Sequence, residues 1–229
     1  MKVLIQILFV LSTLSLGYAD DYEEYNAAYA AAYAIKNYNL AYGNGSSQNP
    51  FTDYDGETEG GNCTNFVSQC LVAGFIQTTS PKKVFQERFD FDTDRNSGSY
   101  YEWFFHNDGD RGPAWTGAAK LYEYAVHNPS HYKGLHFQYI THDTSSDFME
   151  YTKVRVGDII FVDWEGNGSI DHAMIVTKYE SWRWGYNEIR VTYQSNNRLH
   201  KGLGDLNEEH NYDALFYVYR PLDYNPEGL

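Results

Sequence analysis

Hydrophobic and polar positions along the first half of the chain follow a helical period. Tyrosines recur every three to five residues across residues 22–42, and an apolar run covers residues 63–73; both patterns predict helices. Gly43 and Gly74 follow these runs and are suitable residues to end them. A third helix is predicted over residues 114–127, because an Asn-Pro pair comes directly after it.

The second half of the chain changes to a period of two, which is typical of strands. Strands are predicted over residues 158–164, 172–177, 188–196 and 214–220. Residues 165–168 contain an Asn-Gly pair and predict a tight turn between the first two strands. Helices followed by an antiparallel meander indicate an α+β fold, with the N-terminal helices packed on the sheet.

The first 19 residues have the features of a secretory signal peptide. Lys2 gives a basic start, residues 3–16 are mainly apolar, and small residues stand at Gly17 and Ala19. We expect cleavage after Ala19, which leaves residues 20–229 as one domain in a secreted or extracytoplasmic protein. The alternative is an uncleaved N-terminal anchor, although the apolar run is short for a membrane span.

Charge and composition narrow the classes of partner. The 229 residues include 31 acidic and 17 basic side chains, giving a formal net charge of −14. Removal of Lys2 with the signal peptide makes it −15. Such an acidic chain argues against binding to nucleic acid or to an anionic membrane. Aromatic residues make up 17% of the chain, which argues against disorder.

The two cysteines are placed so that they do not pair easily. Cys63 and Cys70 are seven residues apart in a predicted helix, so their Cα atoms are expected roughly 10 Å apart. A disulfide needs about 4.4–6.8 Å. Cys63 stands at the predicted start of the helix, where backbone N–H groups and the helix dipole lower the pKa of a thiol. We expect Cys70 to be a buried apolar group; a packed thiol is also the alternative for Cys63.

A nucleophilic thiol needs a base, and His172 is the best candidate. It begins a predicted strand directly after a tight turn, a position from which a rigid scaffold presents a side chain. Gln194 and Asn196 share one face of the next predicted strand, and either amide oxygen is a candidate to orient the imidazole. An edge histidine with a structural hydrogen bond is the alternative for His172, and His200 is the next candidate base.

Several blocks of the sequence resemble the putative amidase domain family. Residues 60–69 read Gly-Gly-Asn-Cys-Thr-Asn-Phe-Val-Ser-Gln, similar to the GGDCTNFVSQ signature of that family. The weaker blocks Ala-Trp-Thr-Gly at 114–117, Val-Gly-Asp-Ile-Ile at 156–160 and Asp-His-Ala-Met-Ile-Val at 171–176 follow in the same order. The family is grouped with papain-like cysteine peptidases, near the CHAP and NlpC/P60 amidases. The resemblance therefore implies a papain-like cysteine peptidase fold.

The resemblance also implies roles for single residues. The nucleophile of the family falls on Cys63 and its base on His172. Gln194 falls on the Glu position of CHAP-like relatives, and Asn196 on their Asn position. Asn62 departs from the family, because it replaces the usual Asp and creates the sequon Asn-Cys-Thr, where a sugar would crowd Cys63. Two further sequons begin at Asn44 and Asn167.

Metal and cofactor signals are weak, and we expect no cofactor. Alternating acids begin at Asp90, but Arg95 and Tyr101 stand where an EF-hand needs Gly and Glu. Four histidines cluster in a predicted loop, but the chain has no HExxH zinc motif. These are His127, His131, His136 and His142.

The sequence therefore predicts a secreted cysteine amidase or peptidase that cleaves an amide bond, with a peptide or short amide as partner. Its resemblance suggests peptidoglycan peptides as substrates. The alternative is an inactive amidase-like module that binds wall glycans or peptides through surface aromatics. The tryptophans that would carry such binding are Trp103, Trp115, Trp182 and Trp184.

Overall fold

A computed structural model describes most of the chain after its N-terminal segment. The described residues are 24–43, 48–56, 61–87, 89–90, 102–127, 134–143, 153–181 and 187–225. The predicted signal peptide lies outside them. Within these ranges, no helix combines the length and apolar character needed to cross a membrane.

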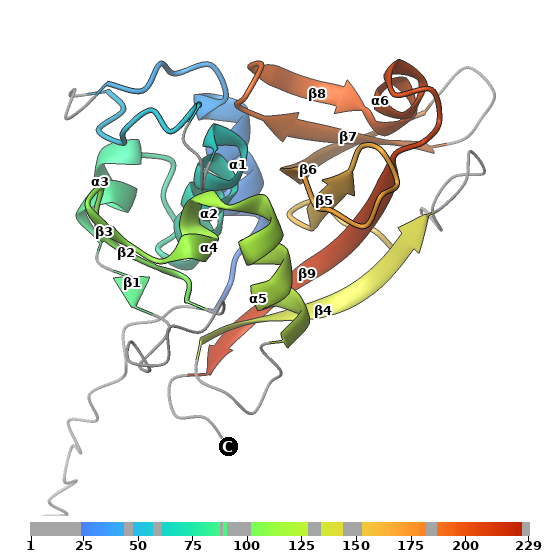
Figure 1. Ribbon diagram of the computed structural model, residues 1–229. Helices are drawn as coiled ribbons and strands as arrows, with labels where there is room; N and C mark the ends of the chain where they lie inside the picture. The colour runs from blue at the N-terminus through green and yellow to red at the C-terminus, as the bar shows by residue number, and fades with distance from the viewer. Residues whose placement is uncertain are drawn as a thin grey trace, which may run out of the picture.

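The described elements form an α+β fold, as predicted (Figure 1). The helices are α1 (Ala27–Asn37), α2 (Asn62–Phe75), α3 (Pro81–Gln86), α4 (Pro113–Thr116), α5 (Ala118–His127) and α6 (Leu203–Glu209). Three short strands pair as a small sheet: β1 (Phe89–Asp90), β2 (Phe104–Asn107) and β3 (Asp110–Arg111). The strands of the main sheet are β4 (Gly134–Asp143), β5 (Ile159–Asp163), β6 (His172–Ser181), β7 (Asn187–Tyr193), β8 (Arg198–Gly202) and β9 (Leu215–Asn225).

The main sheet is antiparallel, with the strand order β4-β9-β5-β6-β7-β8. Strands β5, β6 and β7 are the first three strands of the predicted meander, and β8, which was not predicted, extends it. The last strand does not extend it, because β9 crosses back and pairs with both β4 and β5. Figure 1 shows β9 and β4 as a long diagonal pair below the meander.

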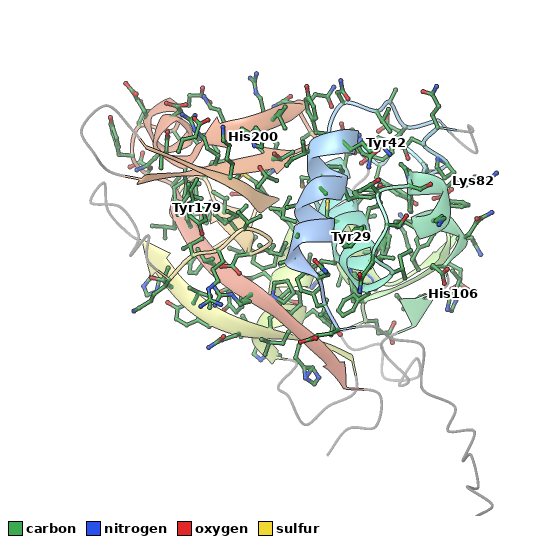
Figure 2. All side chains as sticks on the ribbon, turned by 180° about the vertical axis from the view of Figure 1, so that it is seen from behind. Tyr29, Tyr42, Lys82, His106, Tyr179 and His200 are labelled. Carbon is green, nitrogen blue, oxygen red and sulfur yellow. The ribbon has the colours of Figure 1, made fainter. Side chains whose placement is uncertain are left out.

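Alternating side chains of the central strands build a core on each face of the sheet. Ile159, Phe161 and Ile175 pack with α1, α2 and α5 on one face. Ile160 and Met174 belong to the core of the other face, which includes residues of α6. Seen from behind, α1 lies beside the strands (Figure 2), and both α1 and α2 pack against β6.

The Val-Gly-Asp block has a structural role at the start of β5. The buried carboxylate of Asp158 accepts hydrogen bonds of 2.8 Å from Nε and Nη2 of Arg220, and one of 2.7 Å from the backbone N–H of Arg155. Burial raises the pKa of Asp158, and the hydrogen bonds from Arg220 oppose that shift. Gly157 has a φ of +91°, and a Cβ there would lie 2.5 Å from the Cβ of Ala27, so glycine lets α1 approach β5.

Several predicted boundaries are wrong. The first predicted helix is shorter than its tyrosine stripe, because α1 covers only Ala27–Asn37. The helix predicted over residues 114–127 is two helices that break at Gly117. The strand predicted to end at residue 196 ends at Tyr193, and a turn follows it. The loop predicted around the four histidines contains β4, which carries His136 and His142.

Candidate functional site

The N-terminus of α2 is fixed by the loop before it. Gly61 donates its backbone N–H to the carbonyl of Thr116 at 2.9 Å. The side chain of Asn62 accepts from the backbone N–H of Tyr54 at 3.0 Å and donates to Asp53 at 2.6 Å. These contacts hold the residue before Cys63 against the polypeptide around residue 54.

The sequon at Asn62 is buried. Asn62 is 3% exposed, and both polar atoms of its side chain are engaged. The folded chain therefore has no room for a sugar on Asn62, so the expected crowding of Cys63 does not arise in this structure. Asn167 is exposed, and Asn44 lies outside the described residues.

Cys63 is a buried thiol with polar partners. It is 7% exposed and lies in the first turn of α2, and its Sγ lies 3.5 Å from the hydroxyl of Thr64. Burial by itself would raise the pKa of the thiol. The charge of His172 and hydrogen bonds from His172, Thr64 and the backbone N–H of Ala173 outweigh burial and lower this pKa to about 6.

His172 begins β6, as predicted, at the point where Ala173 meets the thiol. The histidine is 8% exposed, and its Nε2 is buried with no hydrogen-bond partner among the described residues. Two aromatic rings contact the imidazole, those of Trp164 and Tyr193. The structure thus brings Cys63 and His172 together from the start of a helix and the start of a strand.

Gln194 and Asn196 lie in the turn after β7 and differ in burial. Gln194 is 5% exposed and donates its amide N–H to the carbonyl of Leu40 at 2.5 Å. Its Oε1 is buried and has no partner among the described residues. Asn196 is exposed, and the period-two argument that placed it beside Gln194 fails because β7 ends at Tyr193. Neither side chain has a hydrogen bond to His172 among the described contacts.

The second thiol lies in the core. Cys70 is 0% exposed and unpaired, and burial raises the pKa of its thiol well above the ordinary value. Cys63 is likewise unpaired. The two cysteines therefore have opposite shifts of pKa on the same helix, although both are buried.

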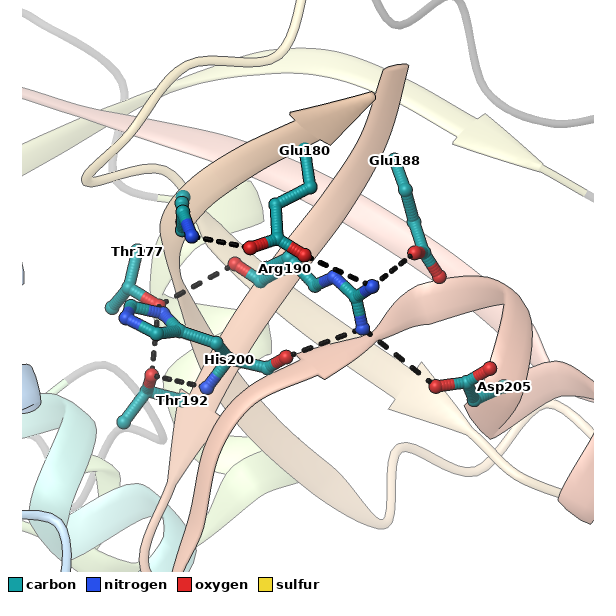
Figure 3. Close-up of polar contacts among 8 residues, drawn as sticks. Thr177, Glu180, Glu188, Arg190, Thr192, His200 and Asp205 are labelled. Carbon is teal, nitrogen blue, oxygen red and sulfur yellow. Dashed lines mark hydrogen bonds and ion pairs between the residues drawn. The ribbon is translucent and has the colours of Figure 1, made fainter. Parts of the chain in front are cut away.

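His200, the next candidate base, belongs to a different cluster. Its Nδ1 lies 3.0 Å from the hydroxyl of Thr177, and its backbone N–H donates to Thr192 (Figure 3). In the same region Arg190 forms ion pairs with Glu188 at 2.8 Å and with Glu180 at 3.1 Å. The contacts of His200 are therefore with residues of β6 and β7 and belong to a cluster separate from Cys63.

Three carboxylates near the start of β6 have the proximity that a metal site needs, those of Asp163, Glu165 and Asp171. Asp163 accepts from the backbone N–H groups of Asn167 and Gly168, at 3.1 and 2.6 Å. Asp171 accepts from the backbone N–H of Trp164 at 3.0 Å. These bonds explain two of the carboxylates as supports of the β5–β6 loop, without a metal.

Sequence reasoning missed the polar contacts that hold α2 in the core. All residues of α2 are buried, including the polar ones. Asn65 accepts from the indole of Trp115 at 3.0 Å, and Ser68 accepts from the indole of Trp103 at 2.9 Å. The signal was present as polar residues on every side of an otherwise apolar helix, but their partners lie far away in the sequence.

A comparison with known protein families confirms the family that the sequence resembles. A family model described as a putative amidase domain matches residues 24–219. No curated protein and no solved structure matches the chain. The match includes the elements that carry Cys63 and His172.

The lowered pKa predicts selective alkylation of Cys63. Because the thiolate is the reacting form, the rate of labelling by iodoacetamide should rise with pH and reach half its maximum near pH 6. Cys70 should stay unlabelled in the folded protein and react only after unfolding. A His172→Ala substitution should move the half-maximum above the ordinary thiol range, because burial is then opposed only by the weaker partners. Peptide mass spectrometry across a pH series measures both sites; equal slow labelling, or a disulfide between them, would contradict the site.

Proposed function

Because the chain belongs to the putative amidase domain family, we propose that it is a secreted cysteine amidase or peptidase that hydrolyses an amide bond. Family membership supports an amidase-like hydrolase. The observation that carries the cysteine mechanism is the buried thiol of Cys63, whose pKa is lowered to about 6 beside His172. Secretion rests on the N-terminal sequence pattern.

The proposed reaction begins with attack by the thiolate of Cys63 on the carbonyl carbon of the amide. A carbon–sulfur bond forms, and negative charge develops on the carbonyl oxygen. The backbone N–H of Cys63 lies in the first turn of α2, where such groups have no helical acceptor, so it is suited to stabilise that oxyanion. As the carbon–nitrogen bond breaks, protonated His172 gives its proton to the leaving amine.

The second half of the proposed reaction releases the acid. A water molecule attacks the thioester carbon while neutral His172 accepts its proton. The carbon–sulfur bond then breaks, which returns Cys63 as thiolate and His172 as imidazolium and frees a carboxylic acid. Protons and electrons balance without a cofactor.

Gln194 is our choice for the residue that fixes the tautomer of His172. Its amide nitrogen donates to the carbonyl of Leu40, and its buried Oε1 has no hydrogen-bond partner among the residues that the structure describes. Within the described part of the chain, Nε2 of His172 is also buried without a hydrogen-bond partner, and the ring of Tyr193, the neighbour of Gln194, contacts the imidazole. A direct or water-mediated hydrogen bond between these two atoms would satisfy both. Asn196 is exposed and is the weaker candidate.

A groove between α5 and the β5–β6 loop is a suitable place for part of the substrate. Its lining includes Tyr122, Glu123, Asn167 and Ile170, and Ile170 is two residues before His172. Aromatic, amide and carboxylate groups in one groove suit a polar peptide-like ligand. The family resemblance, rather than the groove, is the reason that we propose peptidoglycan peptides as the substrate class.

The non-enzymatic alternative loses two of the four tryptophans proposed to carry it. Trp103 and Trp115 are 0% and 1% exposed, and each donates its indole N–H within the core. Trp182 and Trp184, the other two tryptophans of that hypothesis, lie outside the described residues. A buried thiol of lowered pKa also has no use in a module that only binds.

The proposed pair predicts non-additive losses of activity. Cys63→Ala, His172→Ala and the double variant should lose similar turnover, because residues that act as a unit do not contribute independently. Turnover is measured on a panel of peptides and peptidoglycan fragments, with circular dichroism to confirm folding. His200→Ala is the matched control and should keep wild-type turnover. An active, folded His172→Ala variant would show that the base lies elsewhere.

The proposed third residue predicts a difference between two amides of one turn. Gln194→Ala should reduce turnover on the order of 10- to 100-fold if its oxygen holds the tautomer of His172. Asn196→Ala should stay near wild type, because its side chain is exposed. Gln194→Glu keeps an acceptor and adds a charge that stabilises imidazolium, so the basic limb of activity should move to higher pH. The assignment is wrong if Asn196→Ala is crippled while Gln194→Ala is active.

A further inference from the structure

Aromatic rings from separate elements enclose the imidazole of His172. Tyr193, the last residue of β7, meets it edge-on with ring centroids 4.8 Å apart and an interplanar angle of 86°. Trp164, the residue after β5, lies at 5.6 Å with its plane tilted by 40°. Rings in contact from two directions restrict rotation of the imidazole as well as its position.

The indole of Trp164 packs against two further rings. The imidazole of His210, directly after α6, stacks on its indole with centroids 4.0 Å apart and planes only 12° apart. Phe216 of β9 meets the indole edge-on at 6.3 Å. The indole therefore packs on His210 and Phe216 while it also contacts His172.

Hydrogen bonds fix the backbone on both sides of Trp164 in the sequence. Its N–H donates to the carboxylate of Asp171, the residue before His172. Asp163, the residue before Trp164, is buried, and its carboxylate accepts hydrogen bonds from the backbone N–H groups of Asn167 and Gly168 in the β5–β6 loop. The position of the indole is thus tied to both ends of the loop that leads into His172.

We propose that Trp164 and Tyr193 are positioning residues that hold the imidazole of His172 against the thiol of Cys63, with the stacked ring of His210 supporting Trp164. This role rests on the proposed function and extends it, because polar orientation by Gln194 fixes a tautomer but does not enclose the ring. Attraction between imidazolium and thiolate weakens with distance and with entry of water. Packing that keeps the ring in place and dry therefore preserves the ion pair.

The test compares Trp164→Ala with Trp164→Phe and with a matched core variant. The matched core variant is Val176→Ala. It removes buried apolar atoms from the same strand as His172 without changing either ring that contacts the imidazole. Each variant is assayed for thermal stability, for turnover and for the pH dependence of Cys63 alkylation by iodoacetamide. Trp164→Ala should move the half-maximum of alkylation upward by on the order of one pH unit.

The turnover of the variants should change in parallel with their alkylation profiles. Trp164→Ala should reduce kcat roughly 10-fold with little change in KM, since the ring acts on the base rather than on substrate. Trp164→Phe should restore most of kcat and most of the alkylation profile. Val176→Ala should lower the melting temperature while its alkylation profile stays that of the wild type.

Three outcomes would overturn the proposal, and they can be distinguished from one another. A folded Trp164→Ala variant with the wild-type alkylation profile would show that the indole does not position His172, while the proposed cysteine mechanism would stand. If wild type and His172→Ala share one alkylation profile, the mechanism and the positioning role both fail. Should Trp164→Ala not fold, His210→Ala removes only the supporting stack and should give a smaller upward shift; no shift there would also refute the role.

Discussion

The site depends on one electrostatic balance, that between the burial of Cys63 and its attraction to His172. Burial alone favours the neutral thiol, and Cys70 shows this about two turns further along the same helix, where burial raises the pKa of its thiol. At Cys63 the interactions with His172, Thr64 and Ala173 outweigh burial, so the pKa of the thiol falls from 9.0 to about 6. Such a shift means that the site stabilises the thiolate by roughly 4 kcal/mol relative to an ordinary cysteine. A low dielectric strengthens that attraction only while the two side chains stay together.

The rest of the fold keeps these two side chains in place. Helix α2 is buried along its whole length, so its polar residues need partners inside the protein. Tyr33 donates to Gln69 at 2.7 Å, and the indoles of Trp103 and Trp115 donate to Ser68 and Asn65. These contacts fix the rotation and depth of the helix, and therefore the place of its first turn. On the sheet, the hairpin of β5 and β6 fixes His172 by pairing it with Val162.

Most of the site could be predicted from local sequence, and the errors have physical causes. A glycine pair before an apolar run located the start of α2, and a tight turn before a period-two run located His172. The strand β4 was missed because two irregularities in its pairing with β9 interrupt the alternation of side chains. Asn196 was misplaced because the run was read past Tyr193 into a turn, where Asn197 has a φ of +51°. Trp103 and Trp115 looked like ligand-binding aromatics because their hydrogen-bond partners lie at least 35 residues away.

The central claim is that Cys63 forms a covalent bond with the acyl group during catalysis. The direct measurement is peptide mass spectrometry after a rapid acid quench of the protein with p-nitrophenyl acetate, an activated ester that acylates nucleophilic thiols. The account predicts one acetyl group, located on Cys63, in the wild type, and much slower acetylation of that residue in His172→Ala. Acetylation of another residue at the same rate in Cys63→Ala, or none on Cys63 while the ester is turned over, would contradict it.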